Sequence, residues 1–172
     1  GFSGRGDNTA PNLTQVTAIT TPSNNTTPSY VFTTDEAGTI STSISQGFST
    51  SSSASTGSNQ TIIFNTLPEG TYSGETITVT DTAGNPGSIT IPDFVIDTAA
   101  PSVSSFTLSD SALKSGETAT VTIEFSEAVT GFASNDDITV PNGSLPPMTS
   151  SDNITWTGTY TPTAGIEDDS NV

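Results

Sequence analysis

The stretch DTAAPSVSS, residues 97–105, reveals the plan of the chain. A similar phrase, DNTAPNLTQV, occupies residues 7–16, and it places Asp7 and Asp97 90 positions apart. The prolines of the two phrases keep the same offset. Two related phrases at a fixed spacing indicate an internal repeat. The repeat predicts a leader at residues 1–6, a first domain at 7–96 and a second domain at 97–172.

Short alternating runs separated by turn-forming residues fill the first domain, as in SYVFTT (29–34) and GETITVT (74–80). Thr and Val favour strands, whereas Ser, Gly, Asn and Pro favour turns. Six or seven strands at this spacing are typical of an immunoglobulin-like sandwich. The side chains expected to face its interior are Val16, Tyr30, Phe32, Ile40, Ile62, Phe64, Ile77, Val79, Ile89, Ile91 and Phe94.

The second domain repeats the opening strands with VSSFTLS (103–109) and TATVTIEF (118–125). Further strands are expected at DITV (137–140) and ITWTGTY (154–160), but no counterpart of residues 74–97 follows them. The predicted fold class is therefore all-β, with two tandem immunoglobulin-like β-sandwiches, the second lacking its C-terminal strands. We expect the missing strands to lie in sequence beyond residue 172, and a strand donated by another chain is the alternative way to complete such a sandwich.

Composition excludes several classes of function. The 172 residues include 18 acidic and 2 basic side chains, a net charge of −16, and neither His nor Cys. This charge disfavours nucleic acids and anionic membranes, and no apolar run is long enough to cross a bilayer. Without His the usual general base is missing. Adjacent acids occur in loops where nothing indicates a deep cleft, so we predict that the chain is not an enzyme.

Several stretches resemble a known family. Residues 97–144 and the tail ITWTGTYTPTAGIEDDSNV resemble the bacterial Ig-like (BIg) repeats of large secreted, calcium-dependent (RTX-type) surface adhesins. The first domain resembles a sister type through LPEGTYSGETITVTDTAGN and the closing FVID. The resemblance implies tandem stalk repeats on the bacterial cell surface, with neighbouring Ig-like repeats as partners. It also implies calcium near the domain junctions, and a role in cell adhesion or biofilm formation.

The topology of the predicted sandwich explains why acidic residues occur where they do in the sequence. The first strand and the B–C and F–G loops meet at one end of an immunoglobulin-like fold, so three acidic segments are expected to converge there. Carboxylates gathered without basic partners repel one another, and Ca²⁺, which takes six to eight oxygen ligands, relieves that repulsion. The candidate metal ligands are Asp7, Asp35, Glu36, Asp81, Asp97 and Glu127.

Other interpretations of the same residues remain open. Asp7 and Asp97 suit turn caps, and Asp81 suits a turn closed on its own backbone. Asp7 also ends the tripeptide Arg5-Gly6-Asp7, which integrins recognise, although the repeat already explains this acid. Trp156 and its neighbours fit either the core or a glycan-binding platform. The alternatives to a stalk are thus a fibre subunit completed by strand donation and a module that binds a glycan or host protein.

Overall fold

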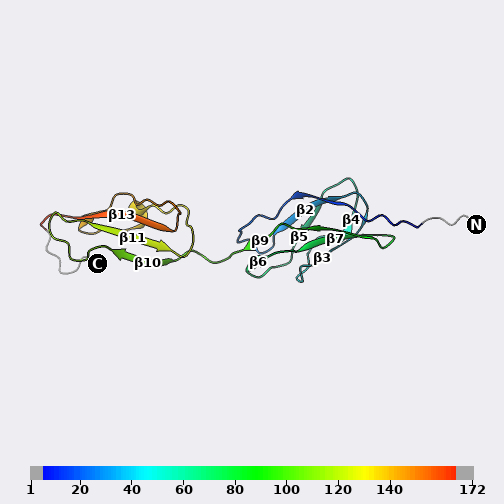
Figure 1. Cartoon of the computed structure of the whole chain (residues 1–172), viewed down its shortest axis with the longest axis horizontal. Helices are drawn as coiled ribbons and strands as arrows, with labels where there is room; N and C mark the ends of the chain where they lie inside the picture. Colours follow the sequence, from blue (N-terminus) through cyan, green and yellow to red (C-terminus); the bar gives the residue numbers. More distant parts are fainter. Residues whose placement is uncertain (1–5, 166–172) are drawn as a thin grey trace, which may run out of the picture. The chain divides into compact units, whose positions relative to one another are not determined.

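The computed structural model describes residues 6–165, and Arg5 therefore lies outside the described part (Figure 1). The chain divides into two compact units, unit 1 ending at Ala99 and unit 2 beginning at Ala100. Among the described residues the helix α1 (Ser134–Asp137) is a single turn, and the other elements are strands. The predicted all-β class is confirmed. No helical segment between residues 6 and 165 reaches the length of a membrane span.

Unit 1 is a sandwich of two antiparallel sheets. One sheet has the order β1-β2-β5, and the other has the order β4-β3-β7-β8. These are the A-B-E and C′-C-F-G orders of an immunoglobulin-like fold. A separate two-stranded sheet pairs β6 with β9 at the end of unit 1 away from its N-terminal segment (Figure 1). The bounds are β1 (Leu13–Thr17), β2 (Ser29–Thr34), β3 (Gly38–Thr42), β4 (Ser53–Ala54), β5 (Gln60–Ile63), β6 (Gly70–Tyr72), β7 (Thr76–Asp81), β8 (Pro86–Thr90) and β9 (Phe94–Ile96).

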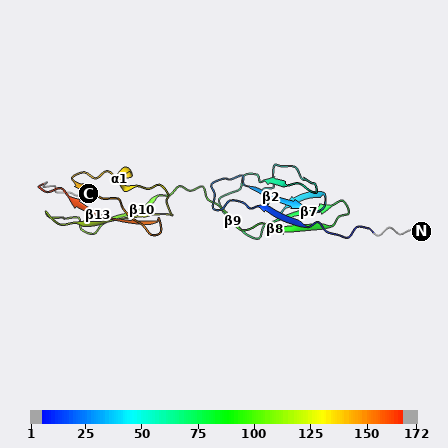
Figure 2. The same cartoon turned by 90° about the horizontal axis from the view of Figure 1, so that it is seen from above.

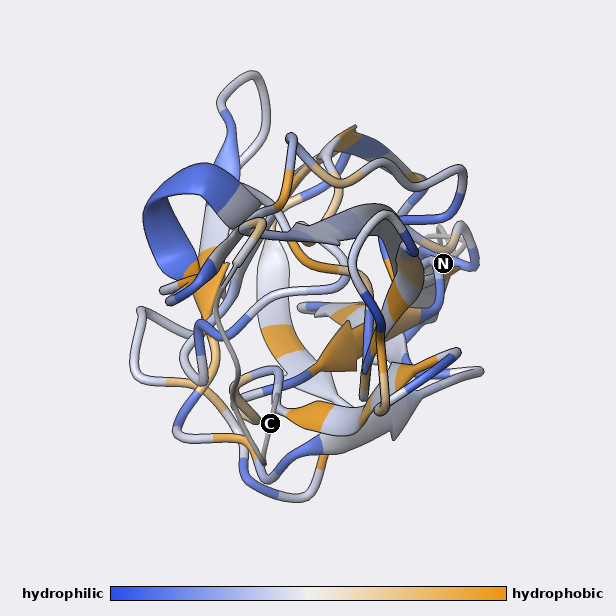
Figure 3. Cartoon of the chain, turned by 90° about the vertical axis from the view of Figure 1, so that its left-hand side faces the viewer, coloured by the Kyte–Doolittle hydropathy of each residue, from blue (hydrophilic) through white to orange (hydrophobic). Residues whose placement is uncertain are grey.

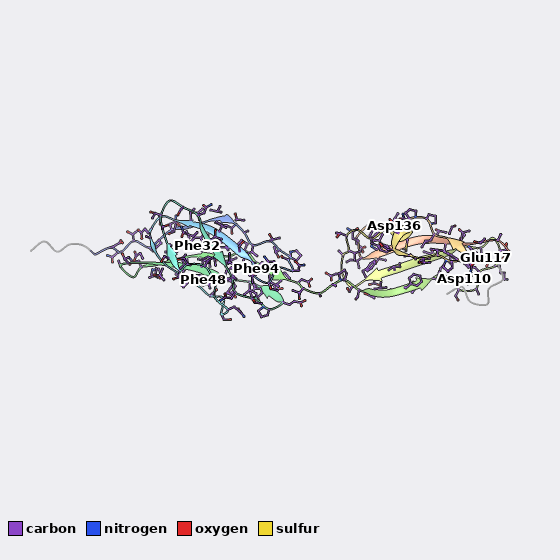
Figure 4. All side chains as sticks on the ribbon, turned by 180° about the vertical axis from the view of Figure 1, so that it is seen from behind. Phe32, Phe48, Phe94, Asp110, Glu117 and Asp136 are labelled. Carbon is purple, nitrogen blue, oxygen red and sulfur yellow. The ribbon has the colours of Figure 1, made fainter. Side chains whose placement is uncertain are left out.

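The core of unit 1 lies between its two sheets, where the buried apolar residues of their strands meet. Figure 3 shows hydrophobic (orange) segments alternating with paler ones along strands of the chain. Figure 4 marks Phe32 and Phe94, which are fully buried, and Phe48, which is partly buried and packs against the core. The predicted interior residues are buried, except that Ile89 is half-buried and Val16 is wrong, being 48 % exposed. A β-bulge between Gln15 and Thr17 shifts the register of β1, and simple alternation from the sequence cannot anticipate that shift.

Unit 2 contains one four-stranded antiparallel sheet in the order β10-β11-β13-β12. This is the A-B-E-D order. The expected strand at 137–140 is wrong, because Asp137 ends α1 and residues 138–140 are irregular. The views in Figures 1 and 2 show α1 and its flanking loops lying over this sheet. The bounds are β10 (Val103–Leu108), β11 (Ala119–Phe125), β12 (Gly143–Ser144) and β13 (Thr155–Pro162).

The core of unit 2 is small. Val121, Ile123 and Met148 are buried, and aromatic residues surround them. Phe132 meets the rings of Phe125 and Trp156 edge to face, at centroid distances of 5.2 and 5.1 Å. The loop that follows β11 therefore packs on the inner face of β11 and β13, where the second sheet of a complete sandwich would lie.

Candidate metal site

Three of the predicted ligands come together at one end of unit 1. A carboxylate oxygen of each of Asp7, Glu36 and Asp81 lies within 4.8 Å of the other two. Asp7 precedes β1, Glu36 lies in the β2–β3 turn, and Asp81 ends β7. In Figure 1 the N-terminal trace (blue) reaches unit 1 at the end where the β7–β8 turn lies. The sandwich thus assembles a cluster, Asp7–Glu36–Asp81, from segments that are distant in sequence.

The β7–β8 turn holds Asp81 in place. Its Oδ1 accepts hydrogen bonds from the backbone N–H groups of Ala83 (2.9 Å) and Asn85 (2.8 Å), and Oδ2 accepts one from Asn85 Nδ2 (2.8 Å). Gly84 supports the turn at a φ of +94°, which other residues rarely adopt. The hydrogen bonds from Asn85 lower the pKa of Asp81, which is 8 % exposed. Asp81 therefore carries a negative charge at a fixed position. The turn closed on its own backbone, which the sequence offered as an alternative to metal binding, is present together with the cluster.

Asn85 also connects the turn to the N-terminal segment. Its Nδ2 donates to the backbone oxygen of Asp7 at 3.1 Å. Asp7 in turn accepts a hydrogen bond at Oδ1 from the backbone N–H of Thr9 (3.0 Å). One amide group thus links the segment before β1 to the turn that carries Asp81.

Glu36 is the least stabilised member of the cluster. Its Oε2 is buried and has no hydrogen-bond partner among the described residues. Burial, followed by the nearby charges of Asp7 and Asp81, raises the pKa of this carboxyl. Thr34 fixes the backbone of Glu36, donating from Oγ1 to its carbonyl oxygen at 2.9 Å. The fold therefore holds a carboxylate in a place that disfavours its negative charge.

Asp35 makes a structural contact outside the cluster, and metal binding by this residue stays a prediction. Its Oδ1 accepts a hydrogen bond from the backbone N–H of Asn12 at 2.6 Å, and its own N–H donates to Asn12 O. Asp35 thereby joins the end of β2 to the start of β1. It lies outside the Asp7–Glu36–Asp81 cluster, although its charge also raises the pKa of Glu36.

Asp97 and Glu127 also lie outside the cluster. Asp97 follows β9 in unit 1, where its N–H donates to Ser23 O (2.9 Å) and its Oδ1 accepts from Ala99 N–H (3.0 Å). This is the turn that the sequence offered as an alternative. Glu127 follows β11 in unit 2, where it is half-buried. Metal binding by these two residues stays a prediction.

The Asp7–Glu36–Asp81 cluster fits a hard cation. Calcium binds oxygen at about 2.3–2.6 Å, so two ligands of one ion lie at most about 5 Å apart. The three carboxylate oxygens meet this condition. The orphaned, buried Oε2 of Glu36 is the kind of atom that a cation satisfies. A carboxylate that is buried without a partner destabilises the folded state.

The raised pKa of Glu36 predicts an unusual pH dependence for metal-free unit 1. The folded state holds this proton more tightly than the unfolded state, so the free energy of unfolding should rise as pH falls from neutral toward about 4.3. With calcium bound, the trend should reverse because protons compete for the ligands. Melting temperatures between pH 7.5 and 5, in calcium-free and calcium-containing buffers, test this. Parallel curves in the two buffers would contradict it.

Two residues of this region were not among the predicted ligands. Asn85 organises both Asp81 and Asp7, and its signal in the sequence is the phrase DTAGN. Gly87 lies so close to the segment before β1 that an added Cβ would be 1.7 Å from Pro11 O. No sequence pattern reveals that approach, since it depends on how β8 meets the other sheet.

Comparison with known proteins supports part of the expected identity. Residues 97–172 match a protein-family model described as a bacterial Ig-like domain. Searches of curated proteins and of solved structures give no match. Bacterial Ig-like domains are a non-enzymatic structural fold, typically found outside the cell or on its surface. The second part of the chain, from Asp97 onward, is thus similar to bacterial Ig-like domains, in agreement with the sheet order of unit 2.

Proposed function

We propose that this chain is a structural stalk segment of a secreted bacterial surface adhesin. Its Ig-like units would extend a distal binding domain away from the cell for adhesion or biofilm formation. The observation that supports the proposal best is the Asp7–Glu36–Asp81 cluster at the N-terminal end of unit 1. Calcium bound there would stiffen the connection to whatever precedes the unit.

The charge of the chain suits an extracellular, calcium-rich setting. It has 18 acidic and 2 basic side chains, so acidic clusters have few basic partners of their own. Calcium sites of extracellular modules work at dissociation constants of about 0.1–1 mM. A site of that affinity is filled outside a cell and provides rigidity only there.

The position of Asp7 explains how an ion would act mechanically. The segment at residues 6–10 is exposed and precedes the first strand. Within the cluster, Glu36 lies in the turn that joins the two sheets, and Asp81 ends a strand of the second sheet. An ion held by all three carboxylates would tie the incoming segment to both sheets. Tension on the N-terminal side would then be carried by ionic contacts as well as by the hydrogen bond between Asn85 and Asp7.

Limited proteolysis tests this role. Calcium is expected to slow cleavage within residues 6–12 at least tenfold, because cleavage requires the segment to open and the open population falls tenfold for about every 1.4 kcal/mol added to the free energy of opening. Asp7→Asn should abolish the protection. Asp110→Asn is the matched control, because this exposed acid lies in the β10–β11 turn of unit 2 (Figure 4) and is not a member of the cluster.

The proposal fails if the cleavage rate at residues 6–12 is the same with calcium and with chelator. It also fails if Asp7→Asn and Asp110→Asn lose protection equally, since that result would indicate a general effect of charge rather than a bound ion.

A further inference from the structure

The turn before β12 imposes two backbone requirements that favour the pair Asn142-Gly143. Asn142 has a φ of +59°, a left-handed conformation in which Asn is enriched among residues that carry a side chain. Gly143 lies beneath the ring of Tyr160, where an added Cβ would be 2.5 Å from the hydroxyl oxygen. The fold thus places a glycine directly after an asparagine. This pair is chemically labile, because no side chain hinders attack of the glycine nitrogen on the asparagine amide.

The carbonyl oxygen of Asn142 accepts two hydrogen bonds. Thr163 N–H donates to it at 2.9 Å, and the Tyr160 hydroxyl donates to it at 3.1 Å. When the N–H of Gly143 loses its proton, the negative charge spreads through the peptide group onto this oxygen. Two donors aimed at the atom where charge develops stabilise the anion, as donors in an oxyanion hole do. The turn therefore favours the reactive form of the Gly143 nitrogen.

The β12–β13 ladder does not use the N–H of Gly143. Gly143 lies opposite Pro162, and the hydrogen bond from Thr163 N–H to Asn142 O makes this a pair without mutual hydrogen bonds. Within the part of unit 2 that the structure describes, β12 is an edge strand, so this N–H points away from β13 and toward no other strand. Asn142 itself is exposed. The proton of Gly143 is therefore not held by the sheet, and water reaches the amide of Asn142.

Asn153 provides a comparison within the same unit. It is also exposed and left-handed, with a φ of +60°, but it precedes Ile154. The N–H of Ile154 donates to Asp152 Oδ1 at 2.9 Å, so its proton is held beside a carboxylate. The branched Cβ of Ile154 also hinders attack by its nitrogen. Asn142 and Asn153 thus share a backbone conformation and differ in the groups that decide reactivity.

We propose that Asn142 is a site of spontaneous deamidation, activated by Tyr160 and Thr163. After the Gly143 nitrogen gives its proton to solvent base, it attacks Asn142 Cγ. The N–Cγ bond forms, the Cγ–Nδ2 bond breaks, and ammonia leaves with a proton taken from water. A water molecule then opens the five-membered imide at either carbonyl, so that position 142 becomes aspartate or isoaspartate. The reaction is independent of the calcium site proposed for unit 1.

Either product changes this edge of the sheet irreversibly. Aspartate adds a negative charge beside β12. Isoaspartate also routes the main chain through the former side chain, so the oxygen that accepted from Tyr160 and Thr163 leaves the backbone. The pairing of β12 with β13 should then open more readily. Deamidated chains are expected to show faster amide hydrogen exchange at Thr163, whose N–H loses its partner.

Peptide mapping by mass spectrometry, after the whole chain is incubated between pH 7 and pH 9, tests the proposal. Conversion at Asn142 should be about tenfold faster than at Asn153, or more, and should increase with hydroxide concentration. Tyr160→Phe keeps the ring over Gly143 but removes one donor, so it should slow conversion at Asn142 about fivefold. Tyr72→Phe is the matched control, because its hydroxyl donates to a backbone oxygen of unit 1, and it should leave the rate unchanged.

Unfolding in urea separates activation by the fold from the reactivity of the sequence alone. In urea the original chain and Tyr160→Phe should react at the same rate, and that rate should be lower than the rate of the folded original chain. The proposal is overturned if Asn142 reacts no faster than Asn153 in the folded chain, or if unfolding accelerates its conversion. It is also overturned if folded Tyr160→Phe reacts as fast as the original chain or faster, since the hydroxyl would then not activate the turn.

Discussion

Calcium is expected to raise the free energy of unfolding of unit 1 by about 2.7 kcal/mol when free calcium is about 100 times the dissociation constant. In a domain of this size such a gain corresponds to a rise in melting temperature of roughly 10 °C or more. The physical reason is that the ion binds the folded cluster of Asp7, Glu36 and Asp81, which the unfolded chain does not assemble. Calorimetry of the chain with calcium and with chelator measures the shift.

Glu36→Gln separates this effect from general screening of charge. In chelator the variant should be at least as stable as the original chain, because it removes a half-buried charge whose buried Oε2 has no partner among the described residues. In calcium it should lose most of the rise, because it removes a ligand. Glu117→Gln, at an exposed turn of unit 2 marked in Figure 4, is the control and should keep the full rise. A calcium-induced rise that survives in Glu36→Gln would contradict the assignment.

Gly87→Ala is expected to destabilise unit 1 by about 3 kcal/mol, near the upper end of overpacking effects. The new Cβ would lie 1.7 Å from Pro11 O and 2.7 Å from its carbonyl carbon, so backbone rather than a flexible side chain must move. Movement of this segment also displaces Asp7, four positions earlier. The variant should therefore bind calcium more weakly as well as unfold at lower denaturant concentration.

Gly6→Ala is the matched control, because an added Cβ there meets nothing within 4 Å. Denaturant unfolding of the two variants provides the comparison. If Gly87→Ala unfolds at the same midpoint as Gly6→Ala, β8 does not press against the segment before β1.

The strands of unit 1 were largely predictable because each carries its own alternation. Phe32, Ile77 and Val79 could be placed inside from period alone, and all three are fully buried. Val16 could not, because a bulge reverses the direction of one side chain without altering composition. The stretch DITV at 137–140 has the composition of a strand, which is why a strand was wrongly expected there. Local hydrogen bonds decide otherwise. Met148 N–H donates to Ser134 Oγ in α1, and Asp137 Oδ2 accepts from Ala133 N–H, which favours a helical turn there.

The topology of the fold predicted which segments meet at the candidate site, but not which side chains do. The meeting of Asp7, Glu36 and Asp81 follows from which loops share one end of an immunoglobulin-like fold. Topology does not give side-chain direction, and Asp35, beside Glu36 in sequence, turns instead toward Asn12. Both acids lie in the β2–β3 turn, where the alternation of a strand does not decide which of them faces Asp7 and Asp81.

Calcium binding to the chain, measured directly by isothermal titration calorimetry, tests the central claim most simply. We expect a saturable calcium site in the original chain that is absent from the triple variant Asp7→Asn, Glu36→Gln, Asp81→Asn. The control variant Asp110→Asn, Glu117→Gln should retain that site. Equal calcium binding by the triple variant and the original chain, or no binding by either at millimolar calcium, would contradict the account.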